Sequence, residues 1–195
     1  MVAPQLLNHP VGDRTQRRFS PRNSLPLASN YLWRIDSGVA RSLTWLEDGT
    51  VVALGVWGKG DLVGKALSKT DPLQIECLTR VEATPVPATA DEQTVAALLK
   101  HLQQAEDLLM IRSHKRTEQT LVRLLNWLAK RFGHEVENGQ LIDLRLTHQD
   151  IAELLGTTRV TITRMLTQLE QQNLIQRLPM HRIVLHEDEL WHYEI

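Results

Sequence analysis

The sequence predicts an α+β protein: an N-terminal β-roll, then a long helix, then a C-terminal winged helix-turn-helix. Three observations predict this order. Short apolar runs separated by turn residues fill the first half, an apolar repeat with helical spacing follows, and two short amphipathic helices joined by a glycine come near the end. The 195 residues are therefore expected to divide into three parts, at 1–88, 89–112 and 113–195.

The composition indicates a globular chain. Of its residues 42 % are hydrophobic and its net charge is −1, so it can bury a core but has no overall basic character. The single cysteine, Cys77, excludes an internal disulfide and any cysteine-based zinc or iron–sulfur site, and we expect it to be buried. No apolar stretch approaches the ~18 residues of a membrane span, and the N-terminus lacks signal-peptide order. We expect a cytoplasmic protein with no membrane contact.

The predicted roll is based on short runs rich in Val, Leu, Ile and Trp. They lie at residues 30–35, 39–46, 51–57, 62–66 and 73–81. The segments between them contain the Gly, Asp or Pro that tight turns require. Regular short strands of this kind indicate a small barrel or roll.

From Thr89 onward the apolar period changes to that of a helix. The predicted stripe consists of Val95, Leu98, Leu99, Leu102, Ala105, Leu108, Leu109 and Ile111. So apolar a stripe needs a partner, and either the roll or the same helix of a second copy supplies one. A second helix is predicted at 115–132. Six Lys or Arg residues lie between Arg112 and Arg131, and we expect them to form a solvated face in preference to phosphate contacts.

The most informative segment runs from residue 147 to 171. Thr147 is a natural N-cap, and Asp150, three residues later, completes a variant of the capping box. Gly156 can adopt the positive φ that ends this first helix in a tight turn. Thr157 or Thr158 then caps a second helix whose apolar positions again follow helical spacing. This pattern predicts a helix-turn-helix in preference to an inert helical hairpin.

The outer face of the second helix has the chemistry of major-groove recognition. Arg159 and Arg164 can pair with guanine, Val160 can touch a thymine methyl group, and threonine can bond a base edge or a phosphate. Strands at 174–177 and 182–186 would form a wing, or a hairpin that only packs. The candidate DNA contacts are Thr147, His148, Gln149, Thr157, Thr158, Arg159, Val160, Thr161, Thr163, Arg164 and Arg182.

These residues resemble the cyclic-AMP receptor protein/FNR family of transcription regulators over nearly the whole chain. The similarity is carried by residues 31–39, 48–49 and 60–62 in the roll and by 142–164, which is most similar to the cyanobacterial nitrogen regulator NtcA. The resemblance implies a homodimer that places helix 158–171 in the major groove of double-stranded DNA. It also implies a palindromic site with half-sites like GTA and TAC, and RNA polymerase as a further partner.

The sensor part departs from the family pattern, and the sequence leaves the effector unknown. The family binds cyclic nucleotide with a Gly-Glu pair and an Arg-Ser pair, but here Gly64 is followed by Lys65, so we expect no response to cyclic AMP. Aligned to the nitrogen regulator, His101 and Glu106 fall at its ligand-binding positions. The candidate effector residues are Gly64, Lys65, His101 and Glu106.

No cofactor or metal site is expected. Haem serves some members of the family, but His101, His114 and Cys77 lie in no recognisable haem motif. A rival hypothesis is a small-molecule-binding module whose winged domain contacts protein instead of DNA. An enzyme is not expected, because the sequence has no nucleophile elbow, P-loop or metal cluster.

Overall fold

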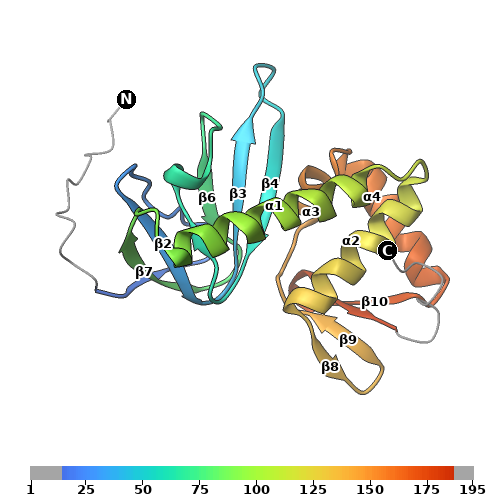
Figure 1. Cartoon of the computed structure of the whole chain (residues 1–195). Coiled ribbons are helices and arrows are strands. Elements are labelled where there is room, and N and C mark those ends of the chain that lie inside the picture. Colours follow the sequence, from blue (N-terminus) through green and yellow to red (C-terminus); the bar gives the residue numbers. More distant parts are fainter. Residues whose placement is uncertain (1–14, 187–195) are drawn as a thin grey trace, which may run out of the picture.

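The computed structural model describes residues 15–186 and confirms the predicted α+β order (Figure 1). In Figure 1 helix α1 runs from the N-terminal sheets on the left to the helical part on the right. The N-terminal elements are β1 (Arg17–Phe19), β2 (Tyr31–Ser37), β3 (Ala40–Trp45), β4 (Val51–Trp57), β5 (Leu62–Val63), the 3₁₀ helix η1 (Lys65–Leu67), β6 (Gln74–Cys77) and β7 (Val81–Pro87). The later elements are α1 (Glu92–Arg112), α2 (Thr117–Phe132), β8 (His134–Val136), β9 (Gly139–Ile142), α3 (His148–Leu155), α4 (Arg159–Gln171), β10 (Ile175–Leu178), the 3₁₀ helix η2 (Pro179–His181) and β11 (Arg182–Leu185).

The N-terminal strands form two antiparallel sheets that enclose an apolar core. Their strand orders are β1-β7-β2-β5 and β4-β3-β6. Trp33 and Ile35 from one sheet and Ile75 and Cys77 from the other belong to the same buried cluster. Cys77 is buried as expected, and burial raises the pKa of its thiol to about 12. The thiol is therefore protonated and inert at neutral pH.

Two of the predicted strands were wrong in extent. The run 73–81 is two strands, because the chain changes sheets at residues 78–80. There the Thr79 hydroxyl accepts a hydrogen bond from the Val39 amide at 2.9 Å. The run 62–66 is a strand only at Leu62–Val63, after which the chain forms η1.

Strand β7 continues further than the sequence indicated. Its last residues include Pro85 and Pro87, which pair with Trp33 and Tyr31 of β2. Proline is tolerated here because β1 pairs with residues 81–83, and within residues 15–186 no strand pairs with the other edge of β7 beyond that point.

Helix α1 has two distinct apolar faces in place of one stripe. Leu108 and Ile111 are buried with Ala97 and Gln104, and the amide of Gln104 pairs with the backbone of Val56 at 2.6 and 2.9 Å. The other predicted apolar residues remain exposed on this single chain. The large ones are Val95, Leu98, Leu99, Leu102 and Leu109, and Met110 adjoins them.

The C-terminal part packs α2, α3 and α4 against the sheet β10-β11-β9-β8. The expectation of a solvated basic face between Arg112 and Arg131 was wrong for these two end residues. Arg112 donates to the carbonyls of Ala53 and Leu154, each at 2.7 Å, and Arg131 pairs with Asp61 at 3.2 Å. Both cations therefore join the C-terminal helices to the roll.

Candidate nucleic-acid interface

The first helix of the predicted helix-turn-helix begins at a complete capping box. The Thr147 hydroxyl accepts from the Asp150 amide at 3.1 Å, and the Asp150 carboxylate accepts from the Thr147 amide at 2.8 Å. This reciprocal pair satisfies two amides that a helix start leaves open. The capping predicted from the sequence is confirmed, and it fixes where α3 begins.

A tight turn then sets the direction of α4. Gly156 has φ 66° and ψ 38°, the left-handed conformation that favours glycine. Of the two threonines that could cap the next helix, the structure uses Thr158, whose hydroxyl accepts from the Thr161 amide at 3.2 Å. Ile162, Met165, Leu166 and Leu169 face the core, so the opposite face of α4 is turned outward.

The outward face of α4 presents two arginines with no partner in the described chain. Neither Arg159 nor Arg164 forms a side-chain hydrogen bond or ion pair within residues 15–186, and both are exposed. Between them Val160 is 79 % exposed, an unusual position for a β-branched apolar side chain. These residues line a shallow hollow together with Thr163, Thr167, Gln168 and Gln171. The sequence-based selection of contacts omitted Thr167 and Gln171.

The threonines of this face are already bonded within the protein. The Thr163 hydroxyl donates to the Arg159 carbonyl at 2.9 Å, which leaves its oxygen to accept from Nδ1 of His148 at 2.8 Å. The Thr161 and Thr158 hydroxyls lie 2.9 Å apart. The two arginines and Val160 therefore have the greatest freedom to meet a ligand.

Basic groups from three elements surround His148 at the start of α3. Burial lowers the pKa of His148, and the charges of Arg177, His181 and Arg159 lower it further. The rings of His148 and His181 lie 6.3 Å apart, so the wing approaches the helix-turn-helix. A phosphate placed here would lie near the guanidinium groups of Arg159 and Arg177.

The remaining predicted contacts lie at the edges of this surface. Gln149 is exposed but donates to Glu153 at 3.0 Å, and Thr157 is half-buried in the turn. Arg182, at the start of β11, donates to the Pro179 carbonyl at 3.2 Å. Arg177 is held by an ion pair with Glu170, which lowers the pKa of that carboxyl.

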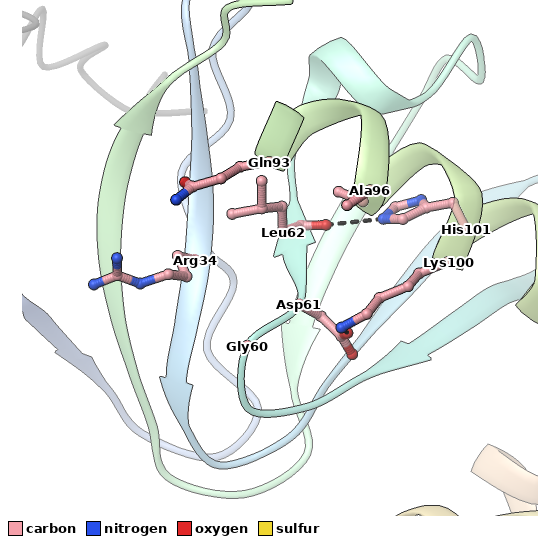
Figure 2. A pocket seen from close by; sticks show the side chains of 9 residues that line it. Arg34, Gly60, Asp61, Leu62, Gln93, Ala96, Lys100 and His101 are labelled. Carbon is pink, nitrogen blue, oxygen red and sulfur yellow. Dashed lines mark hydrogen bonds and ion pairs between the residues drawn. The ribbon is translucent and has the colours of Figure 1, made fainter. Parts of the chain in front are cut away.

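A second hollow, of about 250 Å³, lies between α1 and the roll (Figure 2). It is lined by Arg34, Gly60, Asp61, Leu62, Gln93, Ala96, Ala97, Lys100 and His101. Figure 2 shows His101 directed at the Leu62 carbonyl, 2.8 Å from Nε2, and Lys100 directed at Asp61, 3.4 Å away. A carbonyl only accepts, so Nε2 carries the proton of the neutral ring.

The other predicted effector residues do not line this hollow. Lys65 donates to the Thr70 carbonyl at 2.7 Å and pairs with Asp71 at 3.1 Å. Gly64 is buried, and a Cβ there would approach Leu32 to 2.8 Å. Glu106 is exposed on α1. The four candidates therefore do not gather around one cavity of the described structure.

Where α1 faces the roll, the protein's own side chains occupy the space. The His101 ring stacks on Trp57 with centroids 3.8 Å apart, and burial lowers the pKa of this histidine. Trp57 is itself buried and donates to the Ser42 hydroxyl at 3.0 Å. Within the described residues no group of three or more His, Cys, Asp or Glu side chains is placed to hold a metal ion.

Comparison with known sequences finds relatives that cover both halves of the chain. Residues 119–193 match the Crp-like helix-turn-helix domain. The chain is 44 % identical over 173 residues to the regulatory protein CysR of Synechococcus elongatus, covering 87 % of this chain and 84 % of that protein. It is 37 % identical over 89 residues to the global nitrogen regulator of Synechocystis, covering 46 % and 39 %, and this likeness lies in the DNA-binding part.

Solved structures show the same fold. TTHB099, a transcriptional regulator of the CRP family from Thermus thermophilus, superposes with a TM-score of 0.76 at 20 % identity, covering 88 % of this chain and 92 % of that one. FixK2 from Bradyrhizobium japonicum gives 0.75 at 22 %, covering 91 % and 95 %. In the part of this chain that is described, no helix has the length and hydropathy needed to cross a bilayer.

Proposed function

The chain belongs to the CRP/FNR family of DNA-binding transcription regulators, and from this membership we propose that it binds a palindromic site as a homodimer with α4 in the major groove. The observation that carries the proposal is the outward face of α4. Arg159, Val160 and Arg164 stand exposed there at the start of a helix whose other face is fully packed. In this motif the residues at the helix start reach the base edges.

Each of these side chains has a chemistry suited to one kind of contact. Arg159 can pair bidentately with a guanine, and Val160 can pack against a thymine methyl group. These two contacts fit the GTA-type half-site that the resemblance to the nitrogen regulators implies. Arg164, about one helical turn after Val160, reads a base or binds the phosphate backbone, and His148 and His181 lie together where the wing approaches the helix-turn-helix.

The exposed face of α1 supports the dimer. Leu99 and Leu102 are each 57 % exposed and Leu109 is 65 % exposed on a helix whose opposite face is buried. Residues 95, 98, 99, 102 and 109 follow the spacing of a two-helix interface. Pairing of two such helices would relate the two copies of α4 by a two-fold axis, as a palindrome requires.

Binding is proposed to be independent of cyclic AMP. Lys65 stands where the family has the ribose-binding carboxylate and is tied to Asp71, while His101 and Trp57 occupy the space between α1 and the roll. As a regulator the protein would act in the cytoplasm, in contact with RNA polymerase.

A mobility-shift assay tests this function. The probes are a palindrome of GTA and TAC half-sites, the same DNA with one half-site scrambled, and a fully scrambled duplex. We expect the palindrome to bind about 10³-fold or more tighter than the scrambled duplex. Equal binding of all three probes would contradict sequence-specific recognition. Absence of any binding would favour a winged domain that contacts protein.

A further inference from the structure

A cluster of five charged side chains joins the roll to α3, the first helix of the helix-turn-helix. We refer to it as the interdomain ion cluster; its members are Arg22, Arg41 and Glu76 from the roll and Asp150 and Glu153 from α3. Arg22 holds Asp150 with both terminal nitrogens, at 2.9 and 2.6 Å. Arg41 reaches Glu76 at 2.7 Å, Glu153 at 2.8 Å and Asp150 at 3.0 Å.

Four of the five side chains of the cluster are largely buried, and Arg22 is 42 % exposed. The side chain of Arg41 is 6 % exposed, that of Asp150 4 % and that of Glu153 10 %. Burial alone would raise the pKa of Asp150, but the hydrogen bond from Arg22 and the charge of Arg41 outweigh it and lower that pKa. Removal of one partner would leave a buried charge uncompensated, which is far more costly than loss of a surface pair.

Asp150 belongs both to this cluster and to the capping box that begins α3. It is at once the capping residue of α3 and the shared partner of Arg22 and Arg41. At the other end of α3, Arg112 binds the Leu154 carbonyl. Helix α3 is therefore attached to the roll near its start and to α1 near its end.

The orientation of α3 determines the orientation of α4. The two helices are joined by the tight turn at Gly156, and His148 of α3 bonds to Thr163 of α4. The cluster leaves the reading face accessible, because Arg159 and Arg164 are exposed while it is formed. Besides the cluster, the two parts are joined by Arg112, by the Arg131–Asp61 pair and by apolar packing, and the chain itself passes from α1 to α2 through the short non-helical segment 113–116.

We propose that Arg22 and Arg41 are positioning residues for DNA binding, which hold α4 at one angle to the dimer helix and so set the half-site spacing that the protein accepts. This inference rests on the proposed function, because it requires two copies of α4 on one palindrome. Each added base pair turns one half-site relative to the other by about 34°, since B-DNA turns once per ~10.5 base pairs. A dimer whose two α4 helices are held at one angle binds tightly at only one half-site spacing. A dimer whose α4 helices can reorient tolerates several spacings.

The test measures affinity for palindromes whose spacer is lengthened one base pair at a time, using the full-length protein. The variant is Arg41→Met, and the matched control is Arg18→Met, which removes the exposed pair with Glu82 inside the roll. We expect wild type and control to lose about tenfold or more affinity when the best spacer is lengthened by two base pairs. We expect the affinity of Arg41→Met to fall less than about threefold when the spacer is lengthened in the same way. The variant should also bind the best site more weakly than wild type, because fixing the orientation of α4 now costs free energy on binding.

The dependence of affinity on spacer length, here called the spacing profile, distinguishes a positioning role of Arg41 from a loss of protein stability. A variant that is only less stable loses active protein equally at every spacing, so its profile keeps the wild-type shape, and that result would overturn the proposal. If Arg41→Met fails to fold by circular dichroism, the same criterion applies to Arg22→Met, whose side chain is 42 % exposed. Wild type that binds no palindrome at any spacing would refute the proposed function itself.

Discussion

At the level of single residues, the outer face of α4 divides into side chains that are bonded and side chains that are available. Thr161 and Thr163 have hydrogen-bond partners within the helix-turn-helix, whereas Arg159 and Arg164 have none among the described residues. An exposed arginine without a partner keeps all five N–H donors of its guanidinium group for a ligand. We therefore propose that the arginines are the chief base-reading residues.

Replacement of Arg159 by alanine tests this assignment. We expect Arg159→Ala to weaken binding to the palindrome by about 1–3 kcal/mol and to leave binding to scrambled DNA unchanged, because a guanine contact acts only on the specific site. Titrations of both duplexes at several salt concentrations measure the two affinities. Arg80→Ala, an exposed arginine of the roll, is the control. An equal loss on both duplexes, with a salt slope reduced by about one, would make Arg159 a phosphate contact.

His101 predicts a pH dependence of stability. Burial lowers the pKa of His101 in the folded chain below the ordinary value of 6.5 that it has in the unfolded chain. Between these two pKa values the unfolded chain binds a proton that the folded chain does not. The free energy of unfolding should therefore fall as the pH drops below about 6.5. Urea unfolding between pH 7.5 and 5.5 measures this slope.

A matched pair of variants isolates the contribution of His101. His101→Gln keeps a donor for the Leu62 carbonyl and should flatten the slope, with the part due to His148 remaining. His134→Gln, at an exposed position of β8, should leave the slope unchanged. A slope that persists in full in His101→Gln would show that the buried ring is not its source.

At the level of elements, α1 is the helix with two functions. One face closes the roll through Gln104, Leu108 and Ile111, and the other is an apolar surface exposed on the single chain. The sequence predicted the apolar positions correctly but placed both sets on one stripe. The structure separates them because helical spacing alone does not show which flank of a broad apolar band meets the roll.

Substitution in the exposed face should separate the two copies of the chain. We expect Leu99→Glu to destabilise the dimer by about 3 kcal/mol or more, because two leucines lose burial at ~1.5 kcal/mol each and two like charges are brought together. Sedimentation should then report the chain mass of 22.3 kDa instead of twice that value. Gln103→Glu, beside the exposed face, should remain dimeric. A wild-type chain that sediments as a monomer at micromolar concentration would contradict the dimer.

Local signals decided which elements could be predicted. The capping box at Thr147 and the left-handed turn at Gly156 act over a few residues, so the sequence predicted α3 and α4 closely. The break in the run 73–81 arises from Val39, forty residues away from Thr79, and the proline-containing end of β7 depends on how far β1 extends. Such tertiary conditions leave no periodicity in the sequence.

At the level of the whole molecule, the contacts between the two parts were beyond sequence analysis. Asp150 was predicted as a capping residue, and nothing local indicated that Arg22, 128 residues earlier, holds the same carboxylate. The approach of His181 in the wing to His148 is equally non-local. The residue patterns and the resemblance supplied the order of the parts, but only the structure shows which ion pairs join them.

Hydroxyl-radical footprinting of the wild-type complex tests most directly whether two copies of α4 bind one palindrome. We expect two protected patches on each strand, related by a dyad and centred about one helical turn, ~10 base pairs, apart. One Arg159 should face each half-site, so both patches should weaken together in Arg159→Ala. A single patch, or protection without two-fold symmetry, would show that two copies of α4 do not bind one palindrome.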